Sequence, residues 1–130
     1  MAGLLARLGY RVVILERESF PRYHVGESLT PAIDPLLEFL GVRERIAAAG
    51  FVRMPGHTFR WDGGERTSYF GAAAEGDVLG YQVWRARFDR LLLARARELG
   101  ARAFTGSAVT GLVREDGDGG ERVAGVLVRG

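Results

Sequence analysis

The first sixteen residues decide the fold: Met1-Ala-Gly-Leu-Leu-Ala-Arg-Leu-Gly9 is followed, after one tyrosine, by Arg11-Val-Val-Ile-Leu-Glu16. In the first run three leucines recur at helical spacing, and the closing glycine is a typical helix stop. The second run is nearly continuous, apolar and β-branched, as in strands that parallel sheets bury on both faces. A short helix leading into such a strand is the second half of a βαβ unit. The sequence therefore predicts an α/β fold.

The sequence pattern at both ends of the chain indicates truncation. The first strand and the turn that should precede the helix of a βαβ unit do not occur before Met1, and the strand-like run 122–129 ends with nothing after it to pack on. From the size of a βαβ unit, roughly 15–20 residues are missing at the front. We therefore expect residues 1–130 to be one partial domain of a larger enzyme, truncated at both ends.

Helices and strands are mixed between the two ends. Thr30-Pro31 is expected to start a helix with an apolar face that ends at Gly41, because proline is favoured at the first helical position. A hairpin is predicted around Asp62-Gly63-Gly64. The other expected elements are helices over 42–49 and 84–99, a loop over 72–80, strands over 101–105, 109–114 and 123–129, and a turn over 116–120.

The composition excludes several classes of function. All 18 basic residues are arginine, so there is no lysine for a Schiff base or a Walker-type phosphate site. The lack of cysteine excludes a disulfide framework, a zinc ribbon and a thiol nucleophile. The 16 acidic residues alternate with the arginines and leave a net charge of +2, which argues against nucleic-acid binding. No apolar run approaches the roughly 20 residues that span a bilayer, and no signal peptide is recognisable, so we expect a cytoplasmic protein.

Two segments carry a resemblance to a known family. The first is Leu15-Glu-Arg17 followed by Phe20-Pro-Arg-Tyr-His24 and Gly26-Glu-Ser28, and the second is Trp84-Arg-Ala-Arg-Phe-Asp-Arg-Leu91. In this order they resemble the flavin-dependent halogenases and FAD-dependent oxidoreductases related to aromatic hydroxylases. The resemblance implies a partial Rossmann-like FAD-binding domain with an antiparallel strand excursion, and FAD as the cofactor. The Gly-rich phosphate loop of such domains does not occur in the chain.

Glu16 and Arg17 stand at the end of the predicted strand. An acid at the carboxyl end of such a strand accepts hydrogen bonds from a ribose diol, so Glu16 is a candidate ligand of adenosine; the alternative is an acid that merely ends a strand at the surface. The resemblance extends the cofactor site to Arg17. It also implies that Val109 presents its backbone to adenine, whereas the residues alone favour an ordinary core valine there.

Gly26, Glu27 and Ser28 are placed by the resemblance beside the flavin ring. Gly26 lets the backbone approach a flat ligand closely, and Glu27 and Ser28 precede an expected helix start, where backbone N–H groups lack partners. The alternative is a capping loop with Ser28 or Thr30 as the N-cap and no ligand.

Arg85 is expected at the start of a helix, where the helix dipole disfavours a cation. Pairing with an anionic cofactor explains this position, and the resemblance likewise implies an arginine near the phosphates and ribityl chain of FAD. The alternative is a salt bridge to Asp89, one turn later.

The histidines and tryptophans give weaker signals. His24 and His57 lack metal-ligand spacing, so no metal is expected, and His24 is interpreted as an exposed loop residue. Trp61 and Trp84 are candidates for an aromatic substrate pocket, although aromatic residues at the edges of strands and helices are more often core.

The stretch from Arg53 to Trp61 resembles the region in which flavin-dependent halogenases carry the lysine that handles hypohalous acid. Arginine does not replace that lysine, because a guanidinium does not deprotonate.

We therefore expect the intact protein to be an FAD-dependent oxidoreductase of the monooxygenase type, with no catalytic residue identified. Its substrate would be a small organic molecule, with aromatic compounds as candidates, and its electrons would come from a flavin reductase or from NAD(P)H. The alternatives are a halogenase, a polyprenyl reductase-like enzyme and a non-catalytic interaction module. The 130-residue chain alone is expected to be inactive and to bind FAD weakly or not at all.

Overall fold

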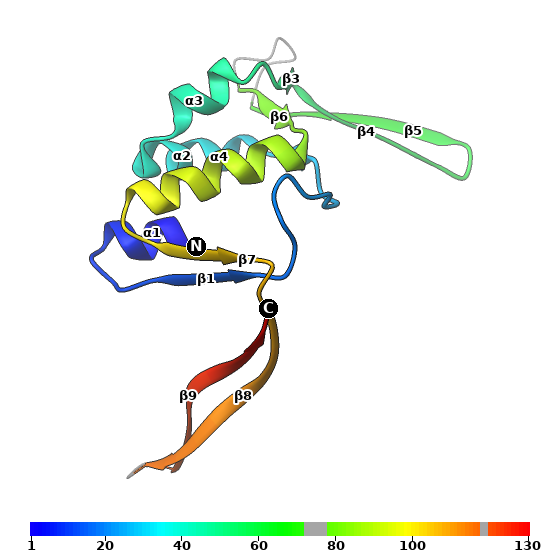
Figure 1. The fold of residues 1–130 in the computed structure, drawn as a ribbon. Helices are drawn as coiled ribbons and strands as arrows, with labels where there is room; N and C mark the ends of the chain where they lie inside the picture. Colours follow the sequence, from blue (N-terminus) through cyan, green and yellow to red (C-terminus); the bar gives the residue numbers. More distant parts are fainter. Residues whose placement is uncertain (72–77, 118–119) are drawn as a thin grey trace. The chain divides into compact units, whose positions relative to one another are not determined.

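The computed structural model describes residues 1–71, 78–117 and 120–130 (Figure 1). The chain divides into two compact units, one made of residues 1–22 and 96–130 and the other of residues 23–95. The boundary between the units falls within helix α4 (Arg85–Glu98). Within the described residues, no helix is long and apolar enough to cross a membrane.

The first unit contains the predicted helix and parallel strand. Helix α1 (Ala2–Arg7) is followed by Gly9, with φ +85°, and then by β1 (Val13–Glu16). β1 pairs in parallel with β7 (Arg102–Thr105), and the two strands lie side by side in Figure 1. The core of this unit consists of small and apolar side chains of α1, α4, the connection from α4 to β7, and β1 with its approach: Ala6, Ala96, Leu99, Ala101, Val12 and Ile14.

Strand β1 is not buried on both faces, contrary to the prediction from its apolar run. Val13 is 56% exposed, and the three residues after it are only half-buried. Within the described residues β1 pairs with β7 alone. A strand becomes fully buried only when it has neighbours on both edges and layers on both faces, and that cover is incomplete here.

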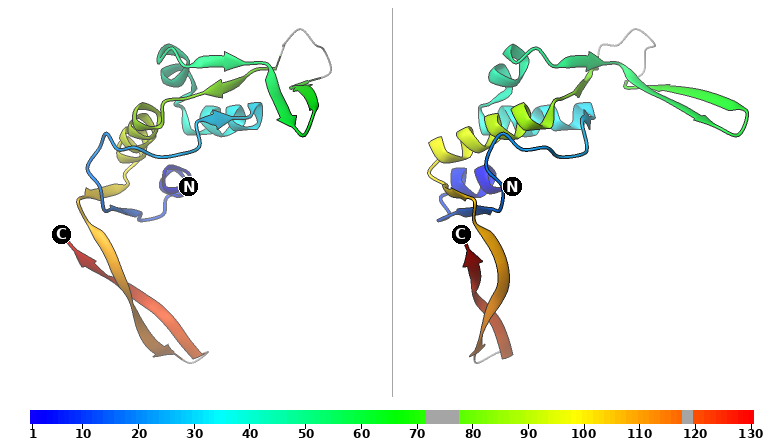
Figure 2. Two further views of the ribbon diagram at one scale, coloured as in Figure 1. Left: turned by 90° about the vertical axis from the view of Figure 1, so that its right-hand side faces the viewer. Right: turned by 45° about the vertical axis from the view of Figure 1, so that its right-hand side comes forward.

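The last two predicted strands form a long antiparallel hairpin. β8 (Ala108–Gly117) and β9 (Gly120–Arg129) extend beyond the ranges that the apolar pattern predicted. The register shifts after Val109 and after Val113. Such irregularities increase strand twist, and the ribbon is visibly twisted in both views of Figure 2. The central residues of the predicted turn, 118–119, lie outside the described residues.

The second unit contains a three-stranded antiparallel sheet that the sequence pattern did not predict. β6 (Gly80–Gln82) lies between β2 (Ser28–Leu29) and β3 (Val52–Met54). Strands of two or three residues are too short to show an alternating pattern. The expected loop over 72–80 is therefore wrong at Gly80, and its residues 72–77 lie outside the described residues. A Cβ at Gly80 would lie 2.4 Å from the Leu29 carbonyl oxygen, so this close strand pairing requires glycine.

The helices of the second unit confirm the predicted segments. They are the 3-10 turn η1 (Pro31–Ile33), α2 (Asp34–Leu40), α3 (Arg43–Ala48) and most of α4. α2 buries Leu37 but leaves Leu36 and Phe39 nearly half exposed, so its apolar face is narrower than expected. The main core combines these helices with β6: Leu37, Val42, Ile46, Tyr81, Val83 and Phe88.

Tyr81 connects β6 to its neighbours. Its hydroxyl donates to the carboxylate of Asp34 in α2 at 3.1 Å, and the guanidinium of Arg53 in β3 lies 4.0 Å from its ring centroid. Burial, followed by the hydrogen bond to Asp34, raises the pKa of the Tyr81 hydroxyl. The residue therefore stays protonated and holds the short strands against α2.

The predicted hairpin is present as β4 (Gly56–Trp61) and β5 (Gly64–Tyr69). Asp62 and Gly63 both have positive φ, at +31° and +82°, as in the tight turns that favour Asp-Gly. Every residue of β5 is exposed. The hairpin therefore owes its form to local turn chemistry rather than to burial.

Candidate functional site

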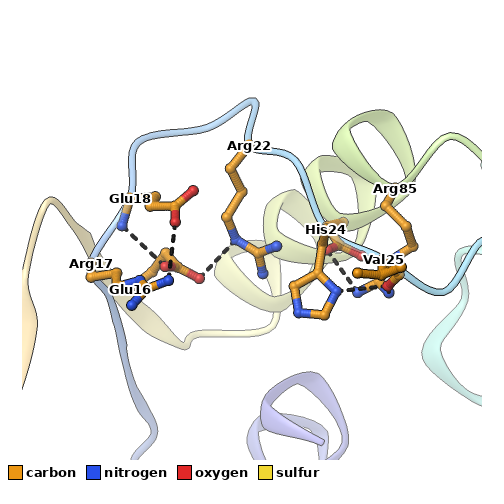
Figure 3. Close-up of polar contacts among 8 residues, drawn as sticks. Glu16, Arg17, Glu18, Arg22, His24, Val25 and Arg85 are labelled. Carbon is orange, nitrogen blue, oxygen red and sulfur yellow. Dashed lines mark hydrogen bonds and ion pairs between the residues drawn. The ribbon is translucent and has the colours of Figure 1, made fainter.

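Arg85, the first residue of α4, holds the segment that contains Gly26. Its Nη1 donates to the carbonyl oxygen of Val25 at 2.8 Å (Figure 3). The same Nη1 donates to the carbonyl oxygen of Gly26 at 3.1 Å. Its Nε and Nη2 donate to the two carboxylate oxygens of Asp89, at 2.8 and 2.9 Å. The two side chains are 21% and 11% exposed. The salt bridge to Asp89, one of the two alternatives for Arg85, is therefore confirmed.

Gly26 occupies a conformation that only glycine adopts readily. Its φ is +91°, and a Cβ there would lie 3.4 Å from Nη1 of Arg85. The next carbonyl, that of Glu27, accepts a hydrogen bond from the Val83 N–H at 2.7 Å. The segment is thus anchored to α4 and to the residue directly after β6 through three consecutive carbonyl oxygens.

Ser28 is not a helix cap, and its backbone does not lead directly into a helix. It lies in β2 opposite Gln82 of β6, and its hydroxyl donates to the Gln82 side-chain oxygen at 2.7 Å. Thr30 is at the N-cap position of η1, but its side chain makes no capping hydrogen bond. The capping interpretation was therefore wrong for Ser28, because pairing with a distant strand extends the backbone where local sequence favoured a helix start.

Glu16 ends β1 as predicted, and its carboxylate is already engaged within the chain (Figure 3). One oxygen accepts the Glu18 N–H at 3.0 Å, and the other accepts Nε of Arg22 at 2.8 Å. The backbone hydrogen bond from Glu18, aided by the Arg22 guanidinium, lowers the pKa of the Glu16 carboxyl despite partial burial. Arg17 extends its side chain to Glu18 at 3.4 Å and is 75% exposed. The sequence analysis did not predict the ion pair between Arg22 and Glu16. The only signal for it was that Arg22 follows Glu16 by six residues in the sequence.

The two histidines lie apart from any metal-binding arrangement. His24 is exposed, as interpreted, and its Nδ1 lies 2.7 Å from the Val25 carbonyl oxygen. Because a carbonyl only accepts, Nδ1 carries the proton. His57 packs edge-on against Phe70, with ring centroids 4.8 Å apart. Among the described residues, no group of three or more acidic or histidine side chains is placed to hold a metal ion.

Three candidates that sequence reasoning favoured as core are exposed instead. Val109 pairs with Val128 in the β8–β9 hairpin and is 50% exposed. Trp61 and Trp84 are 65% and 66% exposed. Val109 and Trp61 lie in two-stranded hairpins and Trp84 directly precedes α4, so an apolar side chain alone did not predict burial. The possible role of the tryptophans in a substrate pocket stays a prediction.

The arginines of the 53–61 stretch have partners within the chain. Besides stacking on Tyr81, Arg53 donates to the Leu79 carbonyl oxygen at 2.8 Å. Arg60 pairs with Glu65 across the β4–β5 hairpin. Arg53 and Arg60 thus each make a contact with a neighbouring strand.

The fold resembles that of FAD-binding halogenases of known structure. The solved structure of the myxobacterial chondrochloren halogenase CndH, a variant of the FAD-dependent halogenases, matches 98% of this chain with a TM-score of 0.85 and 36% identity. The match covers 29% of that structure's chain. The α/β fold with antiparallel strands that the sequence predicted is therefore confirmed.

The chain belongs to the tryptophan halogenase family, whose model matches residues 1–77. A flavin-dependent halogenase of Armillaria mellea, armH4, is 39% identical over an alignment of 121 residues that covers 88% of this chain. A tryptophan 2-halogenase of Chondromyces crocatus is 40% identical over 111 residues, 85% of this chain. The chain spans only 23% and 21% of the lengths of these two relatives.

Proposed function

We propose that this chain is part of the FAD-binding domain of a larger flavin-dependent halogenase that acts on a small aromatic molecule. The observation that carries the proposal is the match of residues 1–77 to the tryptophan halogenase family, supported by about 40% identity to flavin-dependent halogenases. The expected preference for a monooxygenase rested on the missing lysine. That lack concerns only 130 residues, which span less than a quarter of the curated relatives cited above.

The residues present fit a flavin nucleotide. A carboxylate oxygen accepts two hydrogen bonds, so Glu16 retains acceptor capacity for the ribose hydroxyls beside the bonds from Glu18 and Arg22. Gly26 has no side chain to keep a flat ring at a distance, and its φ excludes most other residues. Glu16 and Arg17 are proposed for the adenosine end, and Gly26, Glu27 and Ser28 for the flavin ring. By the family resemblance, the backbone of Val109 would face adenine, and Arg85 would lie close to the phosphates and ribityl chain.

FAD, when bound and reduced, supplies the activation of O₂ that halogenation needs. The residues of this chain would bind the cofactor and orient it. Glu16 is ionised at neutral pH, since its pKa lies below the ordinary carboxyl value, so it would accept hydrogen bonds from ribose and donate none. Arg85 fixes the backbone of the segment that would meet the ring.

Hydroxylation is the second candidate, and one specific observation favours it. The 53–61 stretch contains no lysine, and both of its arginines are engaged with neighbouring strands. Hydroxylation of an aromatic ring would need no such lysine, so the scaffold would serve a monooxygenase equally well. A polyprenyl reductase or a non-catalytic module shares the scaffold but has no observation of its own in its favour.

The decisive experiment supplies the full-length protein with FAD, NADH, a flavin reductase, O₂, bromide and tryptophan or another small aromatic compound. We expect a product whose mass spectrum shows the bromine isotope doublet and which does not form without bromide. An oxygenated product that forms equally well without bromide would identify the monooxygenase instead. Omitting the flavin reductase shows whether NAD(P)H alone supplies the electrons.

We further propose that the protein acts in the cytoplasm and that the 130-residue chain alone is inactive and binds FAD weakly or not at all. Titration of the purified chain with FAD, followed by absorbance and flavin fluorescence, checks the affinity. Near-stoichiometric flavin in the purified chain contradicts the expectation and places a complete binding site within these residues.

A further inference from the structure

Arg85 uses most of its hydrogen-bonding capacity inside the protein. A guanidinium has five N–H donors, and four of those of Arg85 are directed at Asp89 and at the carbonyls of Val25 and Gly26. The pair with Asp89 is bidentate, which fixes the plane of the guanidinium as well as its position. That plane aims Nη1 at the two carbonyl oxygens.

The two carbonyl contacts also determine where the neighbouring N–H groups point. In a planar trans peptide the N–H is antiparallel to the C=O. Because the carbonyls of Val25 and Gly26 face Arg85, the N–H groups of Gly26 and Glu27 point away from it. The positive φ of Gly26 permits this pair of consecutive peptides to turn the same way. Consecutive N–H groups with a shared direction are suited to an electron-rich ligand atom.

We propose that Asp89 is a positioning residue for the Gly26 segment, acting through Arg85 to orient the N–H groups of Gly26 and Glu27 toward the cofactor. The role of these N–H groups rests on the proposed flavin-binding function. In this arrangement Arg85 serves mainly to hold the segment, rather than as a phosphate ligand.

The two roles of Arg85 make opposite predictions for Asp89→Asn. If Arg85 binds phosphate directly, removing the neighbouring negative charge leaves the guanidinium more attractive to an anion, so flavin binds as tightly as before or more tightly. If Arg85 holds the segment, loss of the bidentate pair frees a flexible side chain, and flavin binds less tightly.

The experiment compares Asp89→Asn with wild type in the full-length protein. We expect the flavin Kd to rise about tenfold, the scale of one charge-assisted hydrogen bond. Without flavin, we expect faster hydrogen exchange of the Val83 N–H, which donates to Glu27 and reports the segment directly. Glu65→Gln, which removes an ion pair of the exposed hairpin, is the matched control and should change neither quantity.

Two conservative variants distinguish a positioning role of Asp89 from a role in packing alone. Asp89→Glu keeps the carboxylate and should restore most of the affinity, whereas Arg85→Lys keeps the charge but has a single ammonium and should behave like Asp89→Asn. Arg85→Lys also serves as the test if Asp89→Asn does not fold. Unchanged or tighter flavin binding in Asp89→Asn, or equal losses in Asp89→Asn and Asp89→Glu, overturns the proposal. If wild type binds no flavin, the proposed function fails, and Val83 exchange alone decides whether Asp89 holds the segment.

Discussion

Replacing Gly26 by alanine tests the link between the backbone of the candidate site and its function. A residue with a Cβ at φ +91° costs about 1–2 kcal/mol in backbone strain. Steric contact adds little, because the new Cβ would lie 3.4 Å from Nη1 of Arg85, an ordinary van der Waals distance. We therefore expect Gly26→Ala to lower the free energy of unfolding by about 1–2 kcal/mol. Relief of this strain would turn a carbonyl away from Arg85 and weaken flavin binding.

Gly50→Ala is the matched control for this change. Gly50 also has a positive φ, of +69°, and a Cβ there would meet no heavy atom within 4 Å. It should therefore show a stability loss of about 1 kcal/mol but no change in flavin affinity. Urea unfolding followed by circular dichroism gives the first quantity, and flavin fluorescence titration of the full-length protein gives the second. Equal flavin affinities for the two variants would refute the reasoning, because the conformation of Gly26 would then have no part in cofactor binding.

Three further changes test other parts of the structure. Glu16→Gln should lower the stability by up to about 1 kcal/mol at pH 7. Because the pKa of Glu16 is lowered in the folded state, this difference should be fully present above the ordinary carboxyl pKa of 4.5. It should be lost as the pH falls from there through the lowered folded-state pKa, and a pH series of urea melts checks it. Leu37→Ala should cost about 2–5 kcal/mol because the side chain is 1% exposed, whereas Leu36→Ala, at a 46% exposed position, should cost far less in the same melts. Gly80→Ala should cost about 1–3 kcal/mol by forcing β2 and β6 apart, and loss of the protection of β6 amides from hydrogen exchange measures it.

Local chemistry predicted most of the helices and both hairpins. Gly41, Gly50 and Gly100 follow helices and have positive φ, and Asp62-Gly63 forms the tight turn. These features depend on residues within a few positions of one another, so one sequence contains the whole signal. The sheet β2–β6–β3 was missed for the opposite reason. Its strands are 23 or more residues apart in sequence and owe their pairing to the core around Tyr81.

The sequence by itself determined the parallel α/β unit, the position of Glu16 at the end of β1 and the family resemblance, because these depend on residue type and short spacing. Only the tertiary structure decided what those residues contact. Arg85 meets carbonyls 59 and 60 residues away in sequence, and Ser28 meets Gln82 across 54 residues. Burial was likewise undecided by residue type at Val13 and Val109, since an apolar side chain is buried only where the fold brings another layer over it.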